Sequence, residues 1–253
     1  MGAALAPYKR GAGDATYKVV DGAHHRAFRT PDGPVLLRVE ARRAAGEVHG
    51  TAWGPGADWA LDRLPRMLGA DDDISGFEPP AVLRDVWRWH ADWRIGASGL
   101  VMDALVPAII EQKVTGQEAF GAYCTLVRRF GEPAPGPGLH LGIFVPPAPD
   151  SLREIPSWEW LRLPIDGGRS RPLLAAARVA SSLERAGLEE PEEFERRLTS
   201  IPGIGRWTSA EVRVRALGDA DAVSFGDYHV AKDVNWALTG EEGDDDRLAE
   251  VLE

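Results

Sequence analysis

The chain has 253 residues, of which 44% are hydrophobic and 27% charged, and its net charge is -10 at pH 7. This length suits one large domain or two modest ones, and the composition is that of a globular protein. No apolar run approaches the roughly 20 residues of a membrane span, and residues 1–18 lack the pattern of a secretory signal.

The cysteine count restricts the cofactors and the compartment. Cys124 is the only cysteine, which excludes an intramolecular disulfide and a cysteine-ligated iron–sulfur cluster or zinc ribbon. We therefore expect a protein of the reducing cytoplasm. Separately, we expect it to work as a monomer and to have no membrane partner.

The first part of the chain favours β structure. Four β-favouring runs lie at 17–20, 27–29, 35–39 and 47–53. The Thr-Pro-Asp-Gly sequence at 30–33 is a turn between two of them. We predict a small antiparallel sheet within an N-terminal sheet-plus-helix domain over residues 1–96.

Helices are expected from residue 57 onward. An amphipathic helix covers 57–68, and Pro79-Pro80 precedes a second helix. The apolar side chains of this second helix recur at helical spacing, at Val82, Val86, Trp89 and Trp93. Its tryptophans, Trp87, Trp89 and Trp93, could form a base-stacking surface, but such aromatics are more often core, and we predict core.

The rest of the chain, residues 97–253, is predicted as a helical domain. Helical regions are expected at 102–130 (broken near Thr115-Gly116), 171–186, 191–199, 207–217 and 228–238. Residues 132–149 are rich in proline and glycine and are predicted as loop. The predicted fold class is α+β, mainly α.

A glycine-bearing turn joins two of these helices at 198–208. Gly203 and Gly205 permit backbone conformations that other residues avoid and leave no side chain in the way. Backbone N–H groups at such a turn, next to the start of a helix, suit a phosphate and read no base. The tetrapeptide by itself is also an ordinary turn between packed helices.

The sequence around this turn favours a phosphate-binding turn over an ordinary turn between packed helices. Ile-Pro-Gly-Ile-Gly-Arg-Trp-Thr at 201–208 is followed by Asp-Ala-Asp-Ala-Val-Ser-Phe-Gly-Asp-Tyr-His at 219–229. This pattern resembles the helix-hairpin-helix (HhH-GPD) DNA glycosylases, and most closely the AlkA-like 3-methyladenine DNA glycosylases II. The resemblance implies that the 97–253 domain is the glycosylase domain, with its hairpin at 198–208.

The resemblance assigns catalysis to Asp227, which ends the loop after the hairpin. Aspartate before a helix is otherwise an N-cap, and the two roles are compatible. Hydrolysis of an N-glycosidic bond passes through an oxocarbenium-like transition state, which a nearby carboxylate stabilises while it orients the attacking water. The base must first be rotated out of the duplex. Alkylated purines such as 3-methyladenine and 7-methylguanine already carry positive charge and leave easily.

Trp207 and Tyr228 are the expected substrate-pocket residues. Bifunctional relatives carry a lysine at the position that corresponds to Trp207 and form a Schiff base with the sugar. Tryptophan has no such amine, so the resemblance implies base removal without strand cleavage. Core packing is the competing interpretation for Trp207.

The resemblance also supplies the DNA contacts and a cation site. The expected DNA-binding residues are Gly203, Ile204, Gly205, Arg206, Thr208, Gln112 and Lys113. Lys113 stands where an apolar wedge would enter the gap left by the flipped base, so it could contact phosphates or face solvent. Sodium or potassium can bind to main-chain carbonyls, which by position would be those of Thr199, Ile201 and Ile204. No cofactor is required.

The charge pattern near the hairpin favours DNA in spite of the acidic total. Five arginines occur in this region, Arg196, Arg197, Arg206, Arg213 and Arg215, and binding depends on the charge of one face. Glu211 stands where a pocket aromatic is expected from the resemblance.

The expected partner is double-stranded DNA that contains damaged bases, in the nucleoid. DNA would lie across the hairpin, with Asp227 in a cleft between helical lobes. A non-catalytic DNA-binding protein on the same scaffold is the alternative, and an unrelated metabolic enzyme is a second one.

Overall fold

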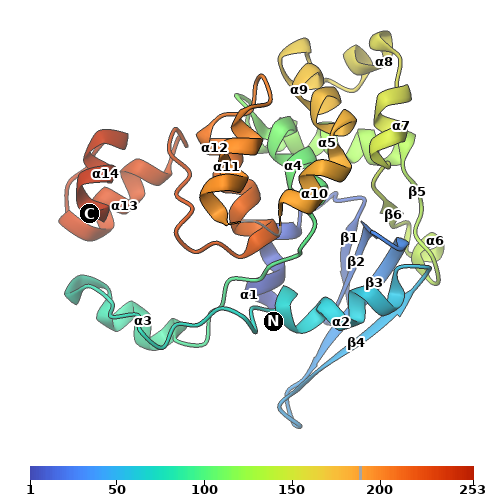
Figure 1. Ribbon diagram of the computed structural model, residues 1–253. Helices are drawn as coiled ribbons and strands as arrows, with labels where there is room; N and C mark the ends of the chain where they lie inside the picture. The colour runs from blue at the N-terminus through green and yellow to red at the C-terminus, as the bar shows by residue number, and fades with distance from the viewer. Residues whose placement is uncertain (188–189) are drawn as a thin grey trace.

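The computed structural model describes residues 1–187 and 190–253. A four-stranded sheet with one helix against it forms one side of the molecule, and helices form the rest (Figure 1). The predicted α+β, mainly α class is therefore confirmed. In the described ranges, every helix is too short or too polar to cross a bilayer.

The sheet is antiparallel, in the order β1-β2-β3-β4. Its strands are β1 (Tyr17–Val20), β2 (Ala23–Thr30), β3 (Gly33–Arg42) and β4 (Glu47–Trp53). In its register, Tyr17 pairs with Arg26, Arg26 with Leu37 and Leu37 with Ala52. The strands lie where the β-favouring runs predict, because apolar side chains such as Phe28 and Leu37 have a core to enter.

Both faces of the sheet are covered. On one face, Phe28, Val35 and Leu37 pack with residues of α2 (Ala57–Met67). On the other face, Ala27 and Leu36 join a smaller apolar cluster with residues of the 132–149 segment, Ala134, Ile143 and Val145. The prediction of a plain loop there is wrong, because the segment forms β5 (Glu132–Pro133), α6 (Gly138–Leu141) and β6 (Phe144–Val145). The proposed domain border at 96/97 stays a prediction.

The helical part surrounds α4 (Val101–Glu111), whose side chains are mostly buried. An all-round apolar sequence of this kind is typical of a central helix. A capping box at Thr115 and Glu118 then starts α5 (Gly116–Phe130), at the predicted break. The region 171–186 is divided into α9 (Gly167–Arg178) and α10 (Ala180–Ala186), because Val179 leaves the helical conformation.

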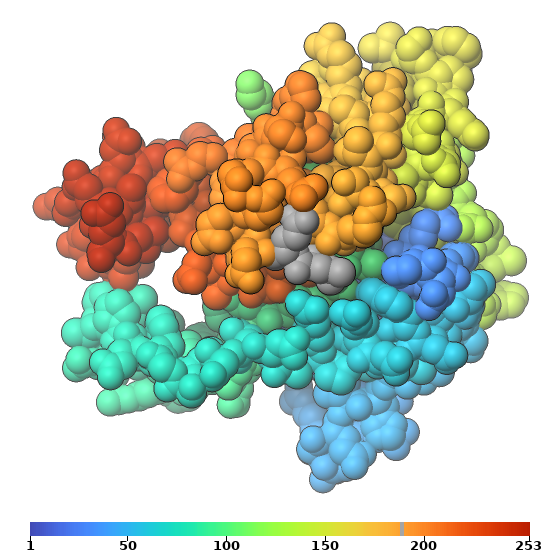
Figure 2. All heavy atoms as spheres, viewed as in Figure 1, coloured from blue at the N-terminus to red at the C-terminus, as the bar shows by residue number. Residues whose placement is uncertain are grey.

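The remaining helices complete the chain. They are α1 (Gly2–Leu5), η1 (Ala6–Tyr8), η2 (Ala81–Leu83), α3 (Arg84–His90), α7 (Pro149–Glu154), α8 (Ser157–Arg162), α11 (Pro191–Thr199), α12 (Arg206–Val212), the π-helical turn η3 (Arg213–Leu217), α13 (Val230–Thr239) and α14 (Asp245–Leu252). The pair α13–α14 forms a lobe at one side of the molecule, with the α3 segment below it (Figure 2).

The prediction that the tryptophans near α3 are core is wrong. Trp89 is 86% exposed and Trp93 is 52% exposed, and only Trp87 is partly covered, with its ring 4.8 Å from that of Phe77. The helical periodicity predicted a helical segment, which η2 and α3 form over residues 81–90. It carried no information about which element, if any, would pack on the apolar side chains of that segment.

Candidate DNA-binding and active site

The hairpin consists of α11, a short turn and α12, as the sequence predicts. Gly203 has φ +92°, and a Cβ atom there would lie 3.1 Å from side-chain atoms of Pro172. Glycine is therefore required at this position on two grounds. Gly205 is different, because its backbone is extended and a Cβ would meet nothing within 4 Å. Its glycine leaves the surface of the turn open.

The turn exposes some of the expected DNA-binding residues and buries others. Gly203, Gly205 and Arg206 are exposed. The side chains of Ile204 and Thr208 are 4% and 2% exposed, and the Ile204 N–H donates to the Ile201 carbonyl at 3.0 Å. Ile204 and Thr208 therefore support the turn from inside, and the open surface belongs to their neighbours.

Gln112 links the central helix to the hairpin. At the end of α4, its Nε2 donates to the Gly203 carbonyl at 3.0 Å and to the Thr208 Oγ1 at 2.8 Å. The next residue, Lys113, is exposed and has φ +56°, a left-handed conformation that is unfavourable for lysine. The chain thus presents Lys113 to solvent beside the turn.

Most arginines of this region are already paired with acids. The ion pairs are Arg196–Glu193, Arg197–Glu193, Arg213–Glu195, Arg213–Asp219 and Arg215–Glu211. Arg206 differs, because its guanidinium lies 4.6 Å from the centre of the Phe225 ring and has no acidic partner among the described residues. The basic face expected from the sequence is therefore much reduced, and Arg206 is the exposed cation at the turn.

Asp227 belongs to the loop that connects η3 to α13. This loop runs between the hairpin helices and the α13–α14 lobe (Figure 1). Asp227 Oδ1 accepts from the N–H groups of His229 (2.8 Å) and Val230 (3.2 Å), and its Oδ2 accepts from Trp207 Nε1 at 3.0 Å. Partial burial raises the pKa of this carboxyl, but the His229, Trp207 and Val230 donors outweigh it and hold the pKa below its ordinary value. The carboxylate is thus ionised and fixed at neutral pH.

The two expected pocket aromatics have different surroundings. Trp207 is partly buried and its indole N–H holds Asp227. Tyr228 is 79% exposed, with its ring against that of His229 and the Lys232 amine 5.3 Å from its centre. The structure brings Trp207 and Asp227 together and leaves the Tyr228 ring on the surface.

Comparison with known proteins identifies the fold. No family model and no curated protein matches the sequence. The structure superimposes on the 3-methyladenine DNA glycosylase of Archaeoglobus fulgidus with a TM-score of 0.80 at 19% identity, over 98% of this chain and 87% of that one. The chain has the fold of the helix-hairpin-helix (HhH-GPD) DNA glycosylases.

Two further structures share this fold and hold DNA. The 8-oxoguanine glycosylase/lyase of Clostridium acetobutylicum, in complex with double-stranded DNA, matches with a TM-score of 0.68 at 12% identity, over 90% of this chain and 77% of that chain. The 3-methyladenine DNA glycosylase of Schizosaccharomyces pombe, in complex with abasic DNA, matches with a TM-score of 0.53 at 19% identity, over 70% and 84%. The glycosylase fold thus serves both glycosylases and glycosylase/lyases.

The expected cation ligands lie where α11 ends and the turn begins. They are the carbonyls of Thr199, Ile201 and Ile204. The Ile201 carbonyl already accepts the Ile204 N–H, and a carbonyl oxygen has a second lone pair that can face a cation. Among the described residues, no group of three or more His, Cys, Asp or Glu side chains is arranged for a metal.

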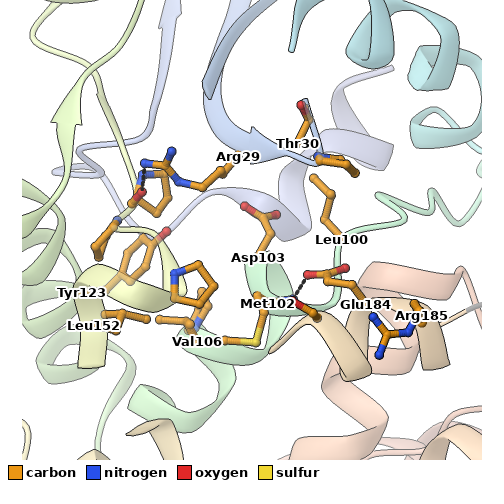
Figure 3. Close-up of a pocket in the computed structure, with 16 residues that line it drawn as sticks. Arg29, Thr30, Leu100, Met102, Asp103, Val106, Tyr123, Leu152, Glu184 and Arg185 are labelled. Atoms are coloured by element: carbon orange, nitrogen blue, oxygen red, sulfur yellow. Dashed lines mark hydrogen bonds between the residues drawn. The ribbon is translucent and has the colours of Figure 1, made fainter. Parts of the chain in front are cut away.

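An apolar cavity of about 470 Å³ lies elsewhere in the glycosylase fold, at the opposite end of α4 from Gln112 (Figure 3). Both acidic side chains of its lining, Glu184 and Asp103, are engaged in the fold. The Glu184 carboxylate accepts the N–H groups of Val101 (2.9 Å) and Met102 (2.8 Å), and Asp103 pairs with Arg26. Burial raises the pKa of Glu184. We assign this cavity to the contact between sheet and helices.

Sequence reasoning missed a charged cluster beside Trp207. Glu211 accepts from Arg215 Nη1 and from Ser224 Oγ, both at 2.6 Å, and Glu111 forms an ion pair with Arg10 at 3.2 Å. The spacing of four residues from Trp207 to Glu211 and on to Arg215 was a visible signal, because such residues share one helix face. No sequence pattern indicated that Arg10 and Glu111 would form an ion pair with each other, because they are about a hundred residues apart in the chain.

Proposed function

We propose that this protein is a monofunctional DNA glycosylase of base excision repair that hydrolyses the N-glycosidic bond of flipped-out alkylated purines in duplex DNA. We propose 3-methyladenine and 7-methylguanine as its substrates. The single observation that carries the proposal is the ionised Asp227 carboxylate, held by Trp207 Nε1 and two backbone N–H groups beside an exposed hairpin turn.

Asp227 acts in the proposed reaction by electrostatics and by orienting water. As the glycosidic bond breaks, positive charge develops on the deoxyribose, and a fixed carboxylate nearby stabilises it. The same carboxylate orients or deprotonates the attacking water. A cationic alkylated purine leaves without strong protonation, so one carboxylate suffices. The indole of Trp207 provides an aromatic surface for the extruded base.

The DNA backbone is proposed to bind at the hairpin turn. Gly203, Gly205 and Arg206 would face the phosphates directly, and Lys113 beside them would add a positive charge. Ile204 and Thr208 support the turn from inside, and Gln112 holds it to α4. Sodium or potassium at the carbonyls of 199, 201 and 204 would stiffen the turn.

The partner is proposed to be damaged double-stranded DNA in the nucleoid, bound by a monomer. A non-catalytic DNA-binding role is the second candidate function. The observation that favours it is the net charge of -10, together with the ion pairs that neutralise most of the hairpin arginines. An unrelated metabolic enzyme would show no binding to duplex DNA.

Replacement of the carboxylate tests the catalytic assignment. Purified protein should release 3-methyladenine or 7-methylguanine from methylated duplex DNA, and Asp227→Asn should abolish release while DNA binding survives. Asp233→Asn, which changes an exposed carboxylate on α13, serves as a matched control and should keep full activity. Full activity in the Asp227→Asn protein would refute the assignment, and DNA binding without release by the wild type would favour the non-catalytic alternative.

A second test addresses strand cleavage. With Trp207 at the position of a nucleophilic lysine, no covalent intermediate with the sugar is available. After base release, the product strand should stay intact until alkali is added, and borohydride should trap no protein–DNA complex. A trapped complex on a denaturing gel would show that another amine performs lyase chemistry.

A further inference from the structure

The charged cluster beside Trp207 lies on the same side of α12 as the proposed catalytic site. Trp207, Glu211 and Arg215 follow each other at intervals of four residues and therefore share one face. The contact of Glu211 Oε2 with Arg215 Nη1 at 2.6 Å shows that this face continues into η3. Trp207, whose indole N–H holds Asp227, therefore lies on the same face as Glu211.

The loop that carries Asp227 is tied to the same face at two points. Trp207 Nε1 donates to Asp227 at 3.0 Å, and Ser224 Oγ donates to Glu211 Oε1 at 2.6 Å. Within the loop, the Asp227 N–H donates to the Ser224 carbonyl at 3.1 Å. Glu211 and Asp227 are therefore connected through one short segment, residues 224–227, that is held against the same face of α12.

The N-terminal segment and the end of α4 add two charged groups to this cluster. Arg10 pairs with Glu111, and their side chains are 7% and 17% exposed. Tyr8 donates to the Arg215 carbonyl at 2.9 Å, which holds the segment against η3. Burial raises the pKa of Glu111, and the charges of Arg10, Arg215 and Glu211 also act on it, so the four charged groups form one cluster.

The Glu211 carboxylate keeps capacity to bind a ligand. Its two oxygens offer about four acceptor positions, and the contacts with Arg215 and Ser224 take one on each oxygen. The side chain is 16% exposed, so it is neither fully buried nor a free surface group. A hydrogen bond from a positively charged donor to such a carboxylate is among the stronger kinds.

We propose that Glu211 is a specificity-determining residue that accepts hydrogen bonds from the extruded base and favours a positively charged guanine-type base. The inference rests on the proposed function. 7-Methylguanine presents two adjacent N–H donors, its ring N1–H and its 2-amino group, which match the two carboxylate oxygens. 3-Methyladenine presents only its 6-amino group on that edge. Glu211 therefore raises the release of 7-methylguanine more than that of 3-methyladenine.

Duplex DNA treated with dimethyl sulfate contains both adducts and supplies the test. The rate constants for release of the two bases are measured in one reaction under single-turnover conditions. Glu211→Gln keeps the shape and an oxygen for Ser224 but removes the charge and one acceptor. The ratio of 7-methylguanine to 3-methyladenine release should fall at least about tenfold. Glu195→Gln removes a charge from another acid–arginine pair, on α11, and should leave the ratio unchanged.

A purely positioning role gives a different result. If Glu211 only holds the Ser224 loop, Glu211→Gln and Ser224→Ala lower both rate constants by the same factor, and that outcome overturns the inference while the proposed function stands. An unchanged ratio with unchanged rates overturns it as well. A wild-type protein that releases neither base overturns the proposed function and this inference with it.

Loss of one partner of an ion pair can destabilise the fold, so a second variant is measured beside the first. Glu211→Gln combined with Arg215→Gln removes both charges and leaves none unpaired. The thermal midpoint of this double variant shows whether it folds, and the ratio of the two rate constants should fall in it as in the single variant. A ratio that stays at the wild-type value in the folded double variant contradicts the inference.

Discussion

At the scale of single residues, the site depends on how one carboxylate is held. Asp227 accepts two backbone N–H groups at the start of α13 and the indole N–H of Trp207. The sequence predicted that this aspartate can be a helix cap and a catalytic group together, and the geometry is compatible with both roles. The hydrogen bond from Trp207 was not predictable, because it depends on how α12 packs against the loop 20 residues later.

The lowered pKa of Asp227 predicts the pH dependence of base release. Its folded pKa is below the ordinary value of 3.8, so the carboxylate stays ionised from pH 5 to pH 8. Protonation of Asp227 should therefore not limit the single-turnover rate in that range, and the acid limb should lie below pH 4. Trp207→Phe removes one donor and should move that limb to higher pH. An acid limb near pH 6 in the wild type would contradict this assignment.

The same shift has a consequence for stability. A carboxyl whose pKa is lower in the folded state stabilises the fold above its unfolded pKa, and this contribution is lost as the pH falls through the folded pKa. Urea unfolding of the wild type and Asp227→Asn should therefore differ by a constant amount above about pH 5 and converge at acid pH. If the difference in unfolding free energy between the two proteins instead grows as the pH falls, the pKa of Asp227 is not lowered by folding.

At the scale of elements, the hairpin was predicted well and the α3 segment was not. The hairpin has strong local signals, namely a proline at the start of α11, Pro191, and two glycines in the turn. The α3 segment has an equally regular apolar pattern, yet Trp89 is 86% exposed. A periodic pattern fixes which side chains share a face, but the partner of that face is a long-range property that no local pattern encodes.

The two glycines of the turn should respond differently to alanine. Gly203→Ala forces an L-residue to φ +92° against Pro172, so we expect a loss of about 1–3 kcal/mol in unfolding free energy. Gly205→Ala meets no neighbour and should change the unfolding free energy by under about 1 kcal/mol. The methyl group of the new alanine would lie where the DNA phosphates are proposed to bind. The affinity of the Gly205→Ala protein for duplex DNA should therefore fall. Denaturant titration and fluorescence anisotropy measure the two effects, and unchanged DNA affinity in the folded Gly205→Ala protein would exclude the turn as a phosphate site.

At the scale of the whole molecule, the question is how a protein with a net charge of -10 can bind DNA. The sequence located the arginines near the hairpin but could not show that Arg213 is held by Glu195 and Asp219, because those partners lie on other segments. An arginine whose charge is balanced by an acid of the protein attracts a DNA phosphate only weakly. The exposed turn with Arg206 and Lys113 is therefore a small positive area on an acidic molecule, which predicts weak binding outside that area.

Salt dependence separates Arg213, which is paired with two acids, from Arg206, which has no acidic partner in the part of the chain that the structure describes. The logarithm of the affinity for undamaged duplex should fall linearly with the logarithm of the salt concentration, with a slope of about -0.9 for each phosphate contact. Arg206→Gln should make this slope less steep by about 0.9, because it removes an exposed cation that the described acids leave unpaired. Arg213→Gln should lower stability, since two acids lose their partner, and should leave the slope unchanged. Arg213→Gln could instead make the slope less steep by as much as Arg206→Gln does. That result would mean that DNA binding breaks the ion pairs of Arg213 and that the positive area extends along η3 beyond the turn.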